Sequence, residues 1–355
     1  RLESIGVIGG GTMGAGIAAA CLLRGLPVTM IERDAESATA GAERLRGVID
    51  GSAKRGLIAD AAATLSRISA QTDYTALSDA DVAIEAVFED MAVKREVFAK
   101  LEAATRSDAV LATNTSYLDI NEIASGLNDP SRVIGLHFFS PAYLMKLLEI
   151  VLPDLVADDV VATGAALAKR LGKIGVLAGG CDGCIGNRIM SRYRREADYL
   201  LEEGATPEAV DGAMRAYGLP MGIFQMQDLA GLDIAWAMRK RRAATRDPNE
   251  RYVTIADQLC EMGRFGQKTG AGWYEYENGR ATASAVVADI IEKARAVAGR
   301  EARDFSPDEI MDRILGALRS EADVVLSEGI ARSADDINVV MVNGYGFPRW
   351  TGGPL

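Results

Sequence analysis

Histidine is almost absent from this sequence. His137 is the only one among 355 residues, so any imidazole chemistry must come from that side chain. The sequence has four cysteines, which are Cys21, Cys181, Cys184 and Cys260. With one histidine and no second cysteine pair, we expect no zinc or other metal centre. The spacing of "CDGC" at 181–184 is typical of redox motifs, but no other feature indicates a thioredoxin-like fold. A reduced compartment is the simpler interpretation.

Long apolar runs and an excess of positive charge are also missing. No apolar run reaches the roughly 18 residues that a membrane-spanning helix needs. The formal net charge is −11, which argues against a surface that binds nucleic acid. The opening residues, "RLESIGVIGG", contain neither an initial Met nor a cleavable secretory pattern. We therefore expect a soluble cytoplasmic protein that binds neither nucleic acid nor membrane, with the missing Met consistent with a chain cut from a longer one.

The length fits two or three domains, and strand-like and helical segments alternate in the first half. Strands are expected at 5–8, 28–31, 80–87 and 109–113, and later in "RVIGLHFF", "KLLEIV" and "IGVLAG". Helices are expected at about 37–54, 91–104 and 158–171. This alternation predicts an α/β, Rossmann-like, parallel doubly wound sheet that binds ligands at the carboxyl ends of its strands.

A glycine-rich turn joins the first expected strand to the first expected helix. Gly9, Gly11 and Gly14 have the G-x-G-x-x-G spacing of a dinucleotide-binding turn. Gly9 permits the tight turn, Gly11 lets the backbone approach a pyrophosphate, and Gly14 allows close packing of helix and strand. Glu32 ends the second strand, where a carboxylate can accept a hydrogen bond from the adenosine ribose. The carboxylate should repel the 2′-phosphate of NADP, so we expect NAD; Arg33 is the counter-argument, because a guanidinium could bind that phosphate.

The second half reads as helical and contains a repeat. "NRIMSRYRREADYLLEEG" at 187–204 matches "DRILGALRSEADVVLSEG" at 312–329. The matched positions are Arg188 with Arg313, Glu196 with Glu321, Asp198 with Asp323, Gly204 with Gly329, and Asp211 with Asp336. The duplication predicts an all-α C-terminal domain in two copies. We expect domains at 1–185, 186–285 and 286–355, and the sequence leaves open whether the last is truncated.

Several motifs together resemble the L-3-hydroxyacyl-CoA dehydrogenase family. They are "VIGGGTMGAGIA", "EAVFEDMAVK", "NTS", "HFFSPAYLMKLLEIV", "GNRI" and "GRFGQKTGAGWYEY". The duplicated helical part resembles the multifunctional branch, in which an enoyl-CoA hydratase domain precedes the dehydrogenase. The resemblance implies NAD-dependent oxidation of L-3-hydroxyacyl-CoA to 3-oxoacyl-CoA in fatty-acid β-oxidation, with a fused or associated hydratase as partner.

The same resemblance assigns site residues. Those implied to bind NAD are Gly9, Gly11, Gly14, Glu32, Glu89 and Lys94. Those implied to act in catalysis are His137 with Glu149 as a pair, Ser116 between nicotinamide and substrate, and Asn187 as an amide that orients the substrate. Ser116 and Asn187 would also bind substrate, and the candidates for coenzyme A contact are Lys54 and Arg55.

The chemistry of alcohol oxidation suits the proposed pair. His137 can take the hydroxyl proton as general base, and Glu149 can fix the ring tautomer and support the imidazolium that forms. A carboxylate inside "LLEIV" is unfavourable unless it is paired. Other partners for Glu149 are Lys146 and Arg188. Asn187 could instead cap the helix that begins at "NRI", and Ser116 could be a turn residue.

Two other functions remain open at this point. One is a β-hydroxyacid dehydrogenase acting on a substrate without coenzyme A, and the other is a non-catalytic NAD-binding scaffold. Because single-copy relatives pair their helical domains between subunits, a chain with both copies is expected to be a monomer through an internal pseudo-dimer. The peroxisome is the alternative to the cytoplasm.

Overall fold

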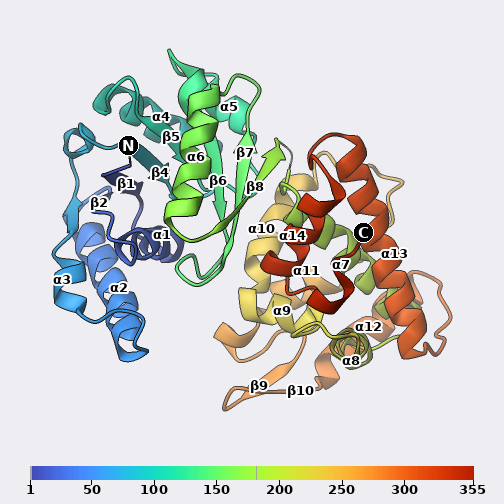
Figure 1. Ribbon diagram of the computed structural model, residues 1–355. Helices are drawn as coiled ribbons and strands as arrows, with labels where there is room; N and C mark the ends of the chain where they lie inside the picture. The colour runs from blue at the N-terminus through green and yellow to red at the C-terminus, as the bar shows by residue number, and fades with distance from the viewer. Residues whose placement is uncertain (1, 181) are drawn as a thin grey trace. The chain divides into compact units, whose positions relative to one another are not determined.

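The computed structural model describes residues 2–180 and 182–355, so Cys181, and with it the redox interpretation of "CDGC", lies outside the described residues. The chain forms two compact units (Figure 1). The first, called the sheet unit here, runs to Arg188 and also contains Val324–Tyr345 and Leu355. The second, the helical unit, contains Ile189–Asp323 and Gly346–Pro354. Among the described helices, none combines the length and the apolar character needed to cross a membrane.

The sheet unit is built on an eight-stranded sheet among its described residues, in the order β3-β2-β1-β4-β5-β6-β7-β8. The strands are β1 (Ile5–Ile8), β2 (Val28–Ile31), β3 (Ile68–Gln71), β4 (Val82–Glu85), β5 (Val110–Thr113), β6 (Val133–Phe138), β7 (Leu147–Leu152) and β8 (Ile174–Gly179). The Rossmann-like fold is confirmed, but the expectation of a wholly parallel sheet is wrong, because β7 runs antiparallel to β6. Residues 139–146 are too few for the crossover that a parallel pair requires.

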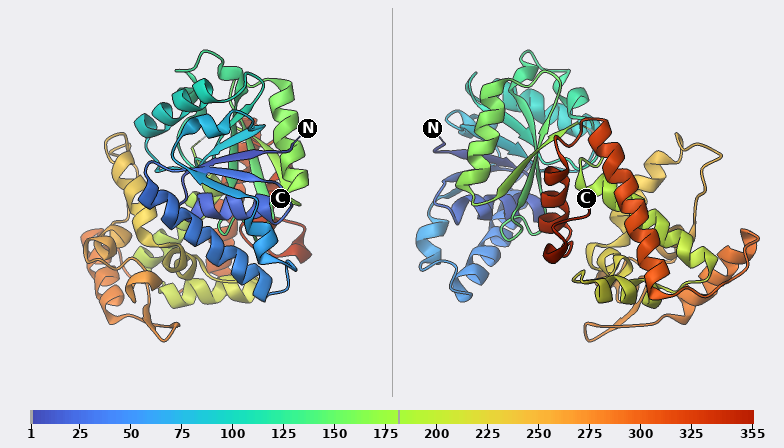
Figure 2. Two further views of the ribbon diagram at one scale, coloured as in Figure 1. Left: turned by 90° about the vertical axis from the view of Figure 1, so that its left-hand side faces the viewer. Right: turned by 45° about the vertical axis from the view of Figure 1, so that its right-hand side comes forward.

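Helices cover both faces of this sheet (Figure 2). They are α1 (Thr12–Leu22), α2 (Ala35–Lys54), α3 (Ala61–Leu65), α4 (Met91–Ala104), α5 (Ile120–Ala124), α6 (Asp158–Arg170) and α14 (Ala334–Gly344), with 3-10 turns η1 (Tyr74–Leu77) and η2 (Pro130–Arg132). Side chains of α1, α2 and α6 share one hydrophobic core with the strands. Aspartates cap the N-termini of α2, α3, α4 and α5; for example, Asp34 accepts from the Ser37 amide and Asp90 from the Val93 amide.

The helical unit contains most of the second half of the chain. Its elements are α7 (Gly186–Glu203), α8 (Pro207–Tyr217), α9 (Ile223–Ala230), α10 (Leu232–Arg242), α11 (Ile255–Glu261), η3 (Gln267–Thr269), the hairpin of β9 (Glu275–Glu277) and β10 (Arg280–Thr282), α12 (Ala285–Val297), α13 (Pro307–Ser327) and η4 (Arg349–Thr351). Helix α7 begins within the sheet unit, and α13 ends within it. The domain boundary expected near residue 185 lies close to Arg188, where the first segment of the sheet unit ends. The boundary expected near residue 285 separates the two repeat copies, but it lies within the helical unit.

The two repeat copies correspond in detail. Helices α8 and α14 each have 11 residues, and each begins after a hydroxyl cap, Thr206 in one and Ser333 in the other. The buried apolar positions then match as Val210 with Ile337, Ala213 with Val340, and Met214 with Met341. Asp211 therefore corresponds to Asn338, and its expected match with Asp336 is wrong by two residues. The second copy has two more residues than the first between the matched glycine and the helix cap, so a constant spacing between the copies does not hold beyond Gly204 and Gly329.

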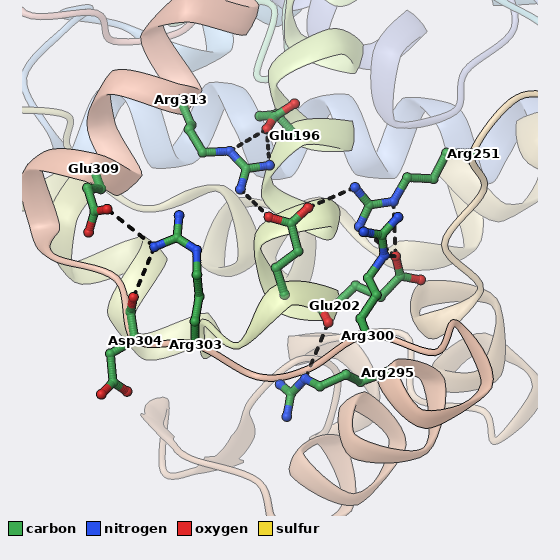
Figure 3. A network of polar contacts seen from close by, with 10 residues as sticks. Glu196, Glu202, Arg251, Arg295, Arg300, Arg303, Asp304, Glu309 and Arg313 are labelled. Atoms are coloured by element: carbon green, nitrogen blue, oxygen red, sulfur yellow. Dashed lines mark hydrogen bonds and ion pairs between the residues drawn. The ribbon is translucent and has the colours of Figure 1, made fainter.

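Matched residues of the two copies also contact each other reciprocally. Arg313 pairs with Glu203 in the helical unit, and their counterparts Arg188 and Glu328 pair in the sheet unit. The first of these pairs belongs to a larger network of arginines and glutamates around α7 and α13 (Figure 3). Reciprocal contacts between equivalent positions are typical of isologous pairing. The duplicated segments therefore associate as two like subunits would.

Candidate functional site

The glycine turn has the conformation that a dinucleotide requires. Gly9 has φ of +97°, and a Cβ there would lie 2.8 Å from the carbonyl oxygen of Ala86. A Cβ on Gly14 would lie 1.8 Å from the Gly9 carbonyl oxygen, so only glycine fits. Gly11 precedes α1 and faces open space, which leaves room for a pyrophosphate against the helix N-terminus. These residues fit an NAD diphosphate.

Glu32 lies beside this turn, directly after β2. Its Oε1 accepts a hydrogen bond from the Gly10 amide, and its Oε2 accepts from the Arg33 amide at 3.2 Å. The Arg33 side chain is held locally, since its Nε donates to Asp34 at 3.1 Å and to Ser37 at 3.3 Å. The Glu32 carboxylate, rather than the Arg33 guanidinium, therefore contacts the glycine turn, where Arg44 also donates to the Gly10 carbonyl oxygen.

His137 and Glu149 stand directly opposite each other in the antiparallel pair of β6 and β7. The His137 Nδ1 and the Glu149 Oε2 are 2.6 Å apart, and the residues are 4% and 0% exposed. The other carboxylate oxygen accepts from the amides of Ile185 at 3.2 Å and Gly186 at 3.0 Å. Arg188, an alternative partner for Glu149, pairs with Glu328. Three hydrogen bonds thus hold the carboxylate in place and tie the imidazole to it.

Ser116 lies on the far side of the imidazole. Its Oγ is 3.1 Å from the His137 Nε2, and its amide donates to Glu89 at 3.1 Å. Asn187 lies inside α7, which begins at Gly186, rather than before the helix as a cap would. The Asn187 Oδ1 accepts a hydrogen bond of 2.7 Å from the Tyr345 hydroxyl.

Behind Ser116, a buried ion-pair network joins β4 to α4. The Lys94 Nζ lies 2.7 Å from Glu85 and 3.2 Å from Glu89, and Lys94 is only 1% exposed. Glu89 also accepts from the Thr115 hydroxyl and from the amide of Ser116. Burial raises the pKa of Glu89, but the charge of Lys94 and these hydrogen bonds outweigh it and hold the pKa below its ordinary value.

Sequence reasoning missed three residues of this region: Glu85, Tyr345 and Cys184. Glu85 offered a signal, because "AIEAV" places a carboxylate inside an apolar strand just as "LLEIV" does. Tyr345 offered none, since it approaches Asn187 from the opposite end of the chain. Cys184 lines a cavity of about 280 Å³ together with Ser116 and Tyr117.

The candidates for coenzyme A contact lie at the end of α2. Lys54 is its last residue and Arg55 follows it, and both side chains are exposed. The Arg55 guanidinium is 5.9 Å from the centre of the Tyr143 ring. Two adjacent exposed cations are available there for phosphate groups.

Comparison with known families matches nearly the first four-fifths of the chain. Residues 4–181 match the family described as "3-hydroxyacyl-CoA dehydrogenase, NAD binding domain". Residues 183–276 match "3-hydroxyacyl-CoA dehydrogenase, C-terminal domain".

Individual proteins agree with this match. The chain is 40% identical over 368 residues to the peroxisomal bifunctional enzyme of Homo sapiens, covering 100% of this chain and 51% of that protein. The chain thus spans about half the length of the curated relatives it matches. Its fold is similar to 3-hydroxybutyryl-CoA dehydrogenase from Escherichia coli, with a TM-score of 0.85, 28% identity, and coverage of 100% of this chain and 90% of that one. M. tuberculosis FadB2 gives a TM-score of 0.74 at 34% identity, covering 78% of this chain and 100% of FadB2.

Proposed function

Because the chain belongs to the 3-hydroxyacyl-CoA dehydrogenase family, we propose that it oxidises L-3-hydroxyacyl-CoA to 3-oxoacyl-CoA with NAD in fatty-acid β-oxidation. The observation that carries the proposal is the row of contacts from Glu149 through His137 to Ser116. It places a buried imidazole between a carboxylate on one side and a hydroxyl on the other. This arrangement suits removal of a proton from a secondary alcohol.

The side chains divide the proton transfer among them. Bound NAD supplies the hydride acceptor. His137 donates a hydrogen bond from Nδ1 to Glu149, so the lone pair on Nε2 can take the substrate hydroxyl proton. Glu149 then stabilises the imidazolium, and its two bonds from the amides of Ile185 and Gly186 keep it in place. Ser116, next to Nε2, donates a hydrogen bond to the substrate oxygen.

Asn187 is proposed to orient the substrate, with Tyr345 as a positioning residue. The Tyr345 hydroxyl donates to the Asn187 Oδ1, and this fixes the plane of the amide. The amide nitrogen then points away from Tyr345 and is directed as a donor. Lys54 and Arg55 are proposed to attract the phosphates of coenzyme A.

Glu89 and Lys94 are proposed to serve the cofactor in different ways. Glu89 binds the loop that carries Ser116, so it can set both that loop and the nicotinamide side of the site. Lys94 is enclosed between Glu85 and Glu89 and is 1% exposed, so its proposed role is to hold Glu89 rather than to touch NAD itself.

Assembly with other protein parts is a separate proposal. Because the chain spans about half of relatives named as bifunctional enzymes, we propose that an enoyl-CoA hydratase part is fused to it or associates with it. The reciprocal contacts between the repeats support a monomer, in which the second copy replaces a partner subunit. Light scattering at micromolar concentration tests this: a stable dimer would contradict it.

The compartment is also a proposal. Matched relatives carry the word peroxisomal in their names, which supports the peroxisomal alternative over the cytoplasm. A fluorescent fusion of the full-length protein, co-imaged with a peroxisomal marker in its own cell type, distinguishes the two compartments.

One assay tests the main proposal. NADH oxidation is measured with acetoacetyl-CoA and, separately, with free acetoacetate. Turnover with the thioester alone supports the proposal. Equal turnover with the free acid would favour a β-hydroxyacid dehydrogenase instead, and NAD binding without turnover of either compound would indicate a scaffold.

A further inference from the structure

Three side chains with different metal-binding atoms meet at the catalytic pair. One ligand atom each from His137, Glu149 and Cys184 lies within 4.8 Å of the others, and all three residues are buried. We propose that these residues form a binding site for a soft divalent cation such as Zn²⁺, whose occupation inhibits the enzyme. The inhibition rests on the proposed dehydrogenase function, whereas the binding does not.

The fold brings the thiol to this position through a short turn. Gly183 has φ of +90° and Cys184 has φ of +51°, so the chain turns sharply just before α7. The next two amides, of Ile185 and Gly186, both donate to the Oε1 of Glu149. These bonds wrap the turn around the carboxylate and hold Cys184 beside it. The sequence predicts no metal centre, and no pattern along the chain connects Cys184 with His137 and Glu149.

The ligand set selects the class of cation. Thiolate, imidazole and carboxylate are the ligands that zinc takes in proteins, whereas Mg²⁺ and Ca²⁺ prefer oxygen ligands alone. Three protein ligands leave a fourth position open, as in zinc sites that bind an exchangeable group. Of the three ligands, Cys184 lines the cavity of about 280 Å³, so an ion that enters this cavity comes next to the thiol.

Only a small rearrangement of the cluster is needed, in which the His137 Nδ1 and the Glu149 Oε2 move apart from their separation of 2.6 Å. Ligand atoms about 2.0–2.3 Å from a tetrahedral zinc ion lie about 3.3–3.8 Å from one another. The three ligand atoms already lie within 4.8 Å. The cation would take the place of the hydrogen between the His137 Nδ1 and Glu149, so that the neutral ring carries its proton on Nε2 instead, and the proton of the thiol leaves to solvent. A ring held by the cation can no longer act as the base, so turnover stops.

Cobalt binding tests the site without any need for activity. The full chain, free of NAD and substrate, is titrated with Co²⁺, whose bond to a thiolate gives a charge-transfer band in the near ultraviolet. We expect one equivalent of Co²⁺ to bind with this band, and Zn²⁺ to displace it. Cys184→Ala should lose the band and bind at least about tenfold more weakly. Cys260→Ala is the matched control, because Cys260 is also buried and reduced but lies in the helical unit.

A second measurement tests the inhibition. For each variant, NADH oxidation with acetoacetyl-CoA is compared with and without Zn²⁺, so that each protein is its own reference. We expect Zn²⁺ to remove at least about nine-tenths of the turnover in the wild type and in Cys260→Ala, but to have little effect on Cys184→Ala.

Several results would overturn the proposal. They are absence of the cobalt band in the wild type, its retention in Cys184→Ala, and its loss in Cys181→Ala while Cys184→Ala still binds. A wild type that binds Co²⁺ with the expected band and keeps full turnover in Zn²⁺ would overturn the inhibitory part. A chain with no turnover at all would count against the proposed dehydrogenase function, while the cobalt titration would still decide the site.

Discussion

Glu89 in the sheet unit and Asp228 in the helical unit accept hydrogen bonds from almost the same kinds of donor. Each carboxylate receives two consecutive backbone amides and one hydroxyl: Ser116, Tyr117 and Thr115 at Glu89, and Trp273, Tyr274 and Tyr276 at Asp228. They differ in charge and in burial: Lys94 lies 3.2 Å from Glu89, which is half-buried, whereas Asp228 is fully buried and the charge of Asp211 adds to the effect of burial. The pKa of Glu89 is held below its ordinary value, whereas burial raises the pKa of Asp228 to about 6.

The comparison shows what neutral donors can do for a buried carboxylate. Three hydrogen bonds reduce the effect of burial at Asp228 without overcoming it, and a cation reverses the balance at Glu89. The carboxylate beside the proposed catalytic serine therefore stays charged across the physiological range. Asp228 fixes the aromatic segment at 273–276, and it titrates close to neutral pH. Similar hydrogen-bond donors thus surround an ionised carboxylate, Glu89, in the sheet unit and a structural carboxylate, Asp228, in the helical unit.

The largest effect on turnover is expected at the pair of Glu149 and His137, because the partner of this carboxylate is the proposed base. His137→Gln should lower kcat by about 10²–10⁴-fold, the usual scale for a general base, while NAD affinity changes little. Glu149→Gln should also lower kcat severely. The double variant should be much less than multiplicatively worse, because both residues serve one proton transfer. Steady-state assays with acetoacetyl-CoA and NADH, with NADH binding measured by fluorescence, check this. Near-normal turnover of His137→Gln would refute the assignment.

Removing the cation should make Glu89 resemble Asp228. Lys94→Met leaves the buried Glu85 and the half-buried Glu89 without their charge partner, so the pKa of Glu89 should rise. Breaking such a buried pair typically lowers the free energy of unfolding by about 3–5 kcal/mol. Urea unfolding measures the loss, and adding Glu85→Gln to Lys94→Met should recover part of it.

Lys100→Met is the matched control for that experiment. Lys100 lies on the same helix α4 and pairs with Glu96, but both side chains are exposed. Exposed pairs contribute little to stability, so this variant should behave as the wild type. A loss as large as that of Lys94→Met would show that the buried network is not what matters.

Glu32 extends the comparison to a carboxylate whose partners are backbone amides beside a ligand site. The account predicts at least about tenfold preference for NAD over NADP, which is roughly 1.4 kcal/mol. Glu32→Ala should narrow that preference by weakening NAD. Catalytic efficiency is measured with both cofactors, and equal values for the wild type would count against the assignment.

The smallest effect is expected on the free energy of unfolding, when one hydroxyl donor is removed from Asp228 or from Glu89. Because the pKa of folded Asp228 lies above its unfolded value, stability falls as pH rises from about 4 to 6 and is level above that range. Tyr276→Phe should raise that pKa further, at a loss of about 1 kcal/mol at pH 8 and less at pH 5. Thr115→Val, the matched variant at Glu89, should show a similar loss at both pH values. Identical pH profiles for the two variants would remove the basis of the comparison.

How much the sequence could predict depended on how local each feature was. The glycine turn and α4 are set by neighbouring residues, and the structure places them as expected. The pairing of His137 with Glu149 was expected from the family resemblance, but their direct opposition follows from the antiparallel direction of β7, which the expectation of a parallel sheet did not include. Tyr345 and Cys184 reach the site through tertiary structure, for which the sequence carries no periodic signal.

The proton on the single imidazole is the most direct test of the central claim that Glu149 orients His137 as the base. Nitrogen NMR of the ¹⁵N-histidine-labelled chain gives signals from one ring, because the protein has one histidine. We expect the neutral ring to carry its proton on Nδ1, towards Glu149, and Glu149→Gln to disturb this tautomer. A neutral ring protonated on Nε2 in the wild type would contradict the account, because no lone pair would then face Ser116 and the substrate.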